Sequence, residues 1–232
     1  MAVKRDYGSF AKATDRLLPA LIRPQGYEPA GNGFFARRRE GWLEGFGLQQ
    51  SQFGGGEFRI NMGIHVPALR ERWLKADDGV HGLSIAFRLS ADGADQGDAW
   101  LPAANRSELE RSLATLVSWL PLAEPWFRQF RSLSDVARIY RERSNLVAPG
   151  GNEHHLRIMA ASYGFLLAEA GDSTEARLWL QEAARLMSLP VYDLPDGGMA
   201  HEKLKGARLQ KPSADGVRQL DAVRRSLAGL LA

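Results

Sequence analysis

The sequence has no cysteine among its 232 residues. Disulfide bonds, thiolate metal sites and cysteine nucleophiles are therefore excluded, and a reducing compartment is compatible with the chain. Long apolar runs are missing as well. The longest, residues 113–127, is interrupted by polar residues and prolines and is shorter than the roughly 20 residues of a membrane span. The first residues turn polar at once and lack the apolar core of a signal peptide. We expect a cytoplasmic, soluble protein without a membrane partner.

A large excess of charge of one sign is also absent. The chain has 30 lysines and arginines and 27 aspartates and glutamates, so its net charge is only +3. Its one local basic run is Arg37, Arg38 and Arg39, and three consecutive strand positions cannot all share one face. We interpret this run as a solvated strand end rather than a phosphate contact, and we do not expect nucleic acid as a partner.

Residues with catalytic or metal-binding spacing are missing too. Of the five histidines, His154 and His155 are adjacent, and adjacent positions of a helix point about 100° apart, so these two side chains are poorly placed to hold one ion. His65 and His81 fall on two predicted strands and would still need a third ligand. No serine lies in a nucleophile-elbow pattern, and no pair of carboxylates stands out. The sequence therefore predicts no catalytic residue, no metal and no cofactor.

A stretch of alternating apolar residues between positions 33 and 89 is the clearest positive feature. Every second residue from 58 to 66 is apolar, and a period of two places these side chains on one face of a strand. Segments 34–38, 42–52 and 80–89 give the other strands of a predicted antiparallel meander with four strands. Residues 25–33, rich in glycine and proline, predict a turn before the meander.

Helical periodicity is found on both sides of this sheet. A helix is predicted over residues 6–23, before Pro24, and another over residues 107–120, before Pro121. Ser107 and Glu110 form a predicted capping box, and Ser134 is the predicted cap of a further helix. The predicted fold class is α+β: an antiparallel four-stranded meander covered by helices on one face, followed by an all-helical C-terminal extension.

The glycine-rich segment 147–152 marks a predicted boundary between an α+β domain, residues 1–146, and a helical extension packed on it, residues 147–232. Within the extension, residues 157–187 resemble a single tetratricopeptide repeat through the spacing of Gly164, Gly171, Ala176, Leu180 and Ala183. One such hairpin cannot bury its own apolar face. We therefore expect it to dock on the upstream domain and on a last helix at 213–231.

Several short segments follow one another in an order that resembles a bacterial family known as domain of unknown function 4304. These segments are Gly26-Tyr27, Gly33-Phe34-Phe35-Ala36-Arg37, Leu48-Gln49-Gln50-Ser51 and Phe58-Arg59-Ile60-Asn61-Met62-Gly63-Ile64. The resemblance covers about residues 6–140. It implies the α+β fold, and no catalytic residue is carried over from it.

The polar face of the predicted sheet is where we expect function first. Its side chains suit partner recognition, because most of them offer both hydrogen-bond donors and acceptors. The candidate binding residues on this face are Gln49, Ser51, Arg59, Asn61, His65, His81 and Arg88.

The sequence thus predicts a non-enzymatic protein-interaction module with another protein as its partner. The alternative is a small-molecule binding protein or enzyme that uses a cleft between the sheet domain and the helical tail, with His65, His81 or His154. The sequence leaves the oligomeric state open.

Overall fold

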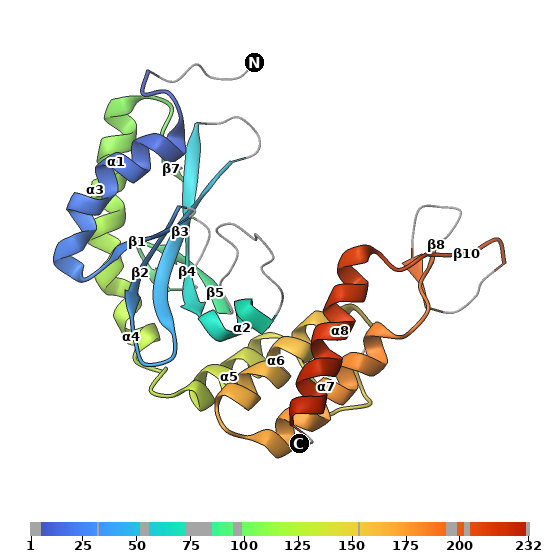
Figure 1. The fold of residues 1–232 in the computed structure, drawn as a ribbon. Coiled ribbons are helices and arrows are strands. Elements are labelled where there is room, and N and C mark those ends of the chain that lie inside the picture. Colours follow the sequence, from blue (N-terminus) through green and yellow to red (C-terminus); the bar gives the residue numbers. More distant parts are fainter. Residues whose placement is uncertain are drawn as a thin grey trace. The chain divides into compact units, whose positions relative to one another are not determined.

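A computed structural model describes residues 6–31, 33–51, 56–72, 85–94, 99–152, 154–193, 199–201 and 205–230 of the chain (Figure 1). The chain divides into two compact units. The sheet unit comprises Met1–Pro67 and Asp77–Arg131, and the helical unit comprises Ala68–Ala76 and Ser132–Ala232. The fold is α+β.

The sheet unit is built on an antiparallel sheet. Its strands β1 to β6 pair in chain order, and β7 pairs with β4. The strands are β1 (Glu28–Gly31), β2 (Phe34–Arg38), β3 (Leu43–Gln50), β4 (Glu57–His65), β5 (Ile85–Ser90), β6 (Gly93–Ala94) and β7 (Leu101–Pro102). The predicted antiparallel meander is therefore present, and it has more strands than the four expected.

The first strand lies in a segment where the sequence predicts only a turn. Pro29 of β1 pairs with Phe35 of β2 at the edge of the sheet, where a strand has no second neighbour that would need the missing N–H of a proline. Gly26 and Gly33 have positive φ angles on either side of β1. The turns are thus confined to the ends of the segment, and the prediction of a turn over its whole length is wrong.

Alternation along β4 divides the sheet into two faces, as predicted. In the middle of this strand, Met62 lies opposite Phe46 of β3 and Phe87 of β5. The apolar side chains of β4 that share this face are at most 1% exposed: Phe58, Ile60, Met62 and Ile64. Burial of such side chains is the main contribution to the stability of the unit.

Helices of the sheet unit pack on this apolar face. The ring of Phe10 in α1 (Phe10–Ile22) lies 5.2 Å from the ring of Phe58, and Trp126 in α4 (Glu124–Phe127) lies 4.0 Å from Phe87, measured between centroids. α3 (Arg106–Trp119) packs beside α1. Figure 1 shows α1 and α3 together along one side of the sheet.

Two helices begin before the caps that the sequence predicts. The side chain of Asn105 accepts a hydrogen bond from the backbone N–H of Glu108 and caps α3. In the same way the side-chain hydroxyl of Ser132 accepts a hydrogen bond from the backbone N–H of Asp135 and caps α5 (Leu133–Arg143). The predicted caps Ser107 and Ser134 lie inside the first turns of these helices, so both predictions are wrong by two positions.

The helical unit consists mainly of helices that pack on one another in chain order. α6 (Arg157–Glu169) packs between α5 and α7 (Ser173–Met187), and α8 (Ala214–Gly229) packs on α7. The chain between α7 and α8 forms a small antiparallel sheet in the order β10 (Arg208–Leu209), β8 (Tyr192–Asp193) and β9 (Met199–Ala200). The prediction of an all-helical C-terminal extension is therefore wrong for this segment, where backbone pairing between short strands replaces helix. A short helix, α2 (Pro67–Arg72), precedes β5 in the chain. No helix in the part of the chain that the structure describes has the length and apolar character required to cross a membrane.

α6 and α7 approach each other closely at a glycine. A Cβ atom on Gly164 would come within 2.8 Å of the Leu180 side chain. Next to this point, the rings of Tyr163 and Trp179 meet edge to face with their centroids 5.0 Å apart. A larger residue at position 164 would force the two helices apart or shift Leu180.

The predicted domain boundary at 147–152 forms a loop that is held within the helical unit. The side-chain amide of Asn152 donates to the Glu182 carboxylate of α7 at 3.2 Å and accepts from the backbone N–H of Val147 at 3.1 Å. The two compact units divide earlier in the chain, between Arg131 and Ser132. The division into domains 1–146 and 147–232 stays a prediction.

Candidate functional site

The predicted polar face joins three strands through side-chain hydrogen bonds. The side-chain oxygen of Gln49 on β3 accepts from Arg59 and from Asn61 on β4, each at 3.1 Å. The Asn61 oxygen in turn accepts from Arg88 on β5. The strand register explains this chain of contacts, because Gln49 lies opposite Arg59 and Asn61 lies opposite Arg88.

Much of the hydrogen-bonding capacity of this face is used within the protein. Asn61 is only 4% exposed, and the guanidinium carbon of Arg59 lies 4.8 Å from the centre of the Trp100 ring. Side chains that already satisfy one another gain less from a partner, because a new contact must replace an existing one. These residues connect the strands, and their role in partner binding stays a prediction.

The other described residues predicted for the polar face, Ser51 and His65, lie toward opposite ends of the paired strands β3 and β4. The backbone N–H of Ser51, just beyond β3, donates to the carbonyl of Glu57. His65 lies at the opposite end of β4, where its ring meets the ring of Phe34 edge to face at 6.3 Å. His81 is outside the described residues. The structure therefore brings together Gln49, Arg59, Asn61 and Arg88.

The basic run at Arg37, Arg38 and Arg39 is only partly solvated. Arg38 is exposed, whereas Arg37 points to the apolar face and binds two carboxylates. Its Nε donates to Glu44 at 2.7 Å, and its Nη atoms donate to both oxygens of Glu124 at 2.6 and 2.9 Å. The prediction of a solvated strand end is wrong for Arg37, because alternation along β2, which ends at Arg38, turns the Arg37 side chain to the apolar face opposite Glu44.

Aromatic rings surround the Arg37 guanidinium. Its central carbon lies 5.1 Å from the centre of the Tyr27 ring and 5.3 Å from that of Phe127. Burial raises the pKa of Tyr27, and the charge of Arg37 opposes this effect. Glu44 is 2% exposed and also accepts from Arg39 at 3.1 Å. This cluster contains two arginines and two glutamates, so its charges neutralise one another.

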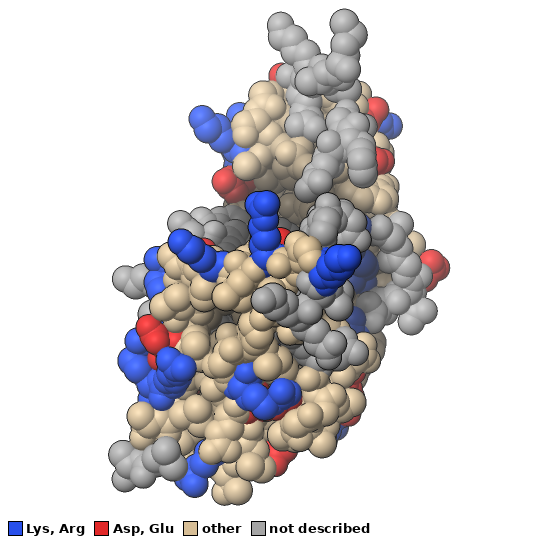
Figure 2. Space-filling view, turned by 90° about the vertical axis from the view of Figure 1, so that its right-hand side faces the viewer, with Lys and Arg blue, Asp and Glu red and all other residues tan. Residues whose placement is uncertain are grey.

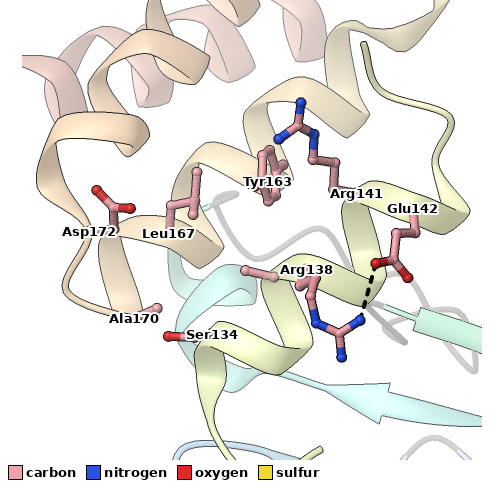
Figure 3. A pocket seen from close by; sticks show the side chains of 9 residues that line it. Ser134, Arg138, Arg141, Glu142, Tyr163, Leu167, Ala170 and Asp172 are labelled. Atoms are coloured by element: carbon pink, nitrogen blue, oxygen red, sulfur yellow. Dashed lines mark hydrogen bonds and ion pairs between the residues drawn. The ribbon is translucent and has the colours of Figure 1, made fainter. Parts of the chain in front are cut away.

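The helical unit contains an open pocket of about 380 Å³ between α5, α6 and the turn that leads into α7 (Figure 3). We call it the α5–α6 pocket. Its apolar lining includes Ala137 of α5, and Leu167 and Tyr163 of α6. Figure 3 shows Asp172 at one end of the pocket and Arg141 at the other, with Leu167 and Tyr163 between them. The remaining lining residues are Ser134, Arg138, Glu142 and Ala170.

Arg141 lies over an aromatic pair formed by Tyr163 and Trp179. Its guanidinium carbon is 5.9 Å from the centre of the Tyr163 ring and 5.5 Å from that of Trp179. Both rings are buried, and the indole N–H of Trp179 donates to the Glu175 carboxylate at 2.9 Å. Burial raises the pKa of Tyr163, and Arg141 opposes this effect through its charge and a hydrogen bond. The rings therefore fix the position of a half-buried cation at the pocket.

The described residues show no arrangement suited to metal chemistry. No group of three or more histidines, cysteines, aspartates and glutamates in them is placed to hold a metal ion. His154 begins a short 3₁₀ helix, His154–Leu156, in the helical unit. The predicted alternative, a ligand site between the sheet domain and the helical tail with His65, His81 or His154, stays a prediction.

Basic side chains stand in separate groups on the face that Figure 2 shows, with uncharged surface between them. Arg218, Arg224 and Arg225 of α8 are among the exposed arginines. Arg218 is paired with Asp215 on the same helix. A continuous basic stripe along one element is the usual mark of a nucleic-acid surface, and the described residues on the face in Figure 2 do not form one.

Sequence reasoning missed the α5–α6 pocket. The sequence held one signal for part of its lining. Arg138 and Glu142 are four positions apart, and this spacing predicts an ion pair on one face of a helix. The position of Arg141 over Tyr163 could not be found in this way, since it depends on how α5 packs against α6.

Comparisons with protein-family models, with curated proteins and with solved structures find no match to this chain.

Proposed function

We propose that this protein is a non-enzymatic protein-interaction module whose helical unit binds a segment of another protein in the α5–α6 pocket. The observation that carries the proposal is the pocket itself, an open hollow of about 380 Å³ that is lined by both apolar and charged side chains. Apolar surface supplies affinity, and a few fixed polar groups supply orientation. A rigid aromatic pair below Arg141 adds preorganisation.

The arrangement of the helices supports this proposal. Each helix from α5 to α8 packs on its neighbour in the chain, and Gly164 allows α6 to approach Leu180 of α7. We propose that α6 and α7 form a tetratricopeptide-like hairpin whose outer faces are covered by α5 and α8. Stacked helical hairpins of this kind present surfaces that are commonly used for binding other proteins.

For the sheet unit we propose membership of the family known as domain of unknown function 4304. The support is the order of its short segments, of which Gly26-Tyr27 precedes β1 and the other three fall mainly on β2, β3 and β4. Because the polar groups of this face bind one another, we assign partner binding to the helical unit.

A blocking substitution at the rim of the pocket tests the proposed function. Ser134 is exposed and lines the pocket, so Ser134→Trp fills its opening without disturbing the core. The matched control is Ser118→Trp, at an exposed serine of α3 in the sheet unit. Proteins captured from a native lysate by the wild-type chain are purified and titrated against all three chains.

We expect a captured protein to bind the wild-type chain and Ser118→Trp saturably and equally, and to bind Ser134→Trp at least tenfold more weakly. Circular dichroism establishes that each variant is folded. Equal binding of the partner to both tryptophan variants, or no saturable partner, contradicts the proposal. A metabolite that stabilises the wild-type chain against heat but not Ser134→Trp would instead favour a small-molecule site, because ligands that bind only the native state raise its melting temperature.

A further inference from the structure

Arg141 is the charged residue of the α5–α6 pocket whose charge is least compensated. Among the described residues no carboxylate lies within ion-pair distance of its guanidinium. The aromatic pair contacts the cation through the faces of its rings, which attract a positive charge without neutralising it. The carboxyl end of α5, where Arg141 lies, contributes only about half a negative charge.

The other charged side chains that line the pocket already have partners. Arg138 pairs with Glu142 at 3.1 Å and with Asp135 at 3.7 Å, both on its own helix. Asp172 caps α7, where its carboxylate accepts from the backbone N–H of Glu175 at 3.0 Å. The pocket thus presents one half-buried guanidinium for which the described residues supply no carboxylate partner.

The chemistry of a guanidinium indicates what would complete this arrangement. Its N–H groups lie in the plane of the group and match the two oxygens of a carboxylate. A guanidinium has five N–H donors, so an interaction with Tyr163 leaves others for a ligand. A half-buried cation also gains more from an anion than an exposed one, because the surrounding protein screens the attraction less than water does.

We propose that the α5–α6 pocket recognises a carboxylate on an acidic segment of a partner protein, and that Arg141 is the residue that binds it. The partner places an aspartate, a glutamate or its own C-terminal carboxylate against the guanidinium, while apolar neighbours in the same segment contact Leu167 and Tyr163 of the pocket. This inference rests on the proposed function, because it names the chemistry of the partner at that same site.

Selection from a random peptide library displayed on phage, using the full chain as bait, tests the inference. Peptides that also bind Ser134→Trp are removed first, so that the remaining ones depend on the pocket. Each selected peptide is then synthesised with its acidic residues intact and with each changed to the corresponding amide. Both forms are titrated against the wild-type chain, Arg141→Gln, Arg141→Lys and two arginine controls.

The controls separate recognition by Arg141 from a general effect of positive charge. Arg138→Gln removes a charge of the same kind from the same helix and the same pocket, but from an arginine that already has carboxylate partners. Arg224→Gln removes an exposed arginine of α8 outside the pocket. Thermal melting and circular dichroism establish that all variants are folded.

We expect the selected peptides to share an acidic residue. Its change to an amide should weaken binding to the wild-type chain at least tenfold, and to Arg141→Gln less than twofold, which is the sign of a direct pair in a double-mutant cycle. Arg141→Lys should retain part of the affinity. Arg138→Gln should weaken binding at most threefold, and Arg224→Gln should leave it unchanged.

Three results would overturn the inference, and they separate it from the proposed function. Pocket-dependent peptides without an acidic residue would refute the carboxylate and leave the interaction module standing. An amide effect that persists in Arg141→Gln would assign the carboxylate to another group. The absence of any peptide that requires an open pocket would refute both proposals.

Discussion

Among the described residues, each unit has an arginine that contacts two aromatic rings, and the two arginines differ in their carboxylate partners. In the sheet unit Arg37 lies against Tyr27 and Phe127 and binds Glu44 and Glu124. In the helical unit Arg141 lies over Tyr163 and Trp179, and the described residues offer it no carboxylate within ion-pair distance. The aromatic environment is similar, but the balance of charge is not.

This difference shows how a similar local environment can serve two purposes. Around Arg37 the protein supplies its own carboxylates, so the guanidinium joins β2, β3 and α4 and is not available to a ligand. Around Arg141 the residues that the structure describes supply a fixed position and a pocket, but no carboxylate within ion-pair distance. The first arrangement is typical of a structural cluster, and the second is typical of a binding site.

The largest effect is expected where the charges are balanced inside the protein. Arg37→Leu removes the cation between Glu44 and Glu124 and leaves a carboxylate that is 2% exposed with Arg39 alone. Removing one partner of a buried ion pair lowers the free energy of unfolding by about 3–5 kcal/mol. Urea unfolding of the variant measures this loss.

Arg38→Leu provides the control for Arg37→Leu. Arg38 is on the same strand but exposed on the other face, so its substitution should change the unfolding free energy by less than about 0.5 kcal/mol. Equal effects of the two substitutions would show that the Arg37 cluster does not stabilise the sheet unit.

A smaller, pH-dependent effect is expected for the buried carboxylate of the helical unit. Hydrogen bonds from Arg185, at 2.8 and 2.9 Å, and from Asn152 lower the pKa of Glu182 below its ordinary value of 4.5, although burial opposes them. The folded state therefore holds this proton less tightly than the unfolded state. The stabilisation is complete above pH 4.5 and is lost as the pH falls toward the lowered pKa.

Glu182→Gln should therefore cost about 1–2 kcal/mol of unfolding free energy at pH 7, the usual contribution of hydrogen bonds to a charged group. The difference from the wild-type chain should shrink as the pH falls below 4.5. Urea unfolding of both chains between pH 7 and pH 3 checks this, and a difference that stays constant over the range would refute it.

The smallest effect on stability is expected for Arg141→Leu. The substitution removes the contact of a cation with two rings, worth about 0.5–2 kcal/mol. It also removes a positive charge that has no carboxylate partner among the described residues. The leucine keeps an apolar side chain against the aromatic pair. We expect a net change below about 1 kcal/mol in thermal or urea unfolding. A loss comparable to that of Arg37→Leu would mean that Arg141 is structural, and the contrast between the two units would fail.

Local sequence rules predicted some features of the fold and missed others for identifiable reasons. Alternation around Met62 predicted β4 and its buried face. Helix starts were harder, because Asn105 and Ser107, and likewise Ser132 and Ser134, are competing caps two residues apart, and the chain uses the earlier one in both cases. β1 was missed because its proline and glycines indicate turns, whereas pairing with β2 keeps the intervening residues extended.

The candidate sites were less predictable than the fold. Strand register joins Gln49, Arg59, Asn61 and Arg88, as alternation on the polar face suggested, but the sequence could not show that these side chains bind one another. Arg37 belongs to a basic run that looks exposed. Its carboxylate partner Glu124 lies 87 residues further along the chain, too far for any local rule.

The sequence by itself determined the alternation of the sheet, the helices α6, α7 and α8 of the helical unit and the absence of thiol chemistry, because these follow from residue type and short-range spacing. Only the tertiary structure decided which arginine is neutralised and which is not. Charge balance depends on which carboxylates lie within a few ångströms, and for Arg37 and Arg141 that is set by packing between segments far apart in the chain.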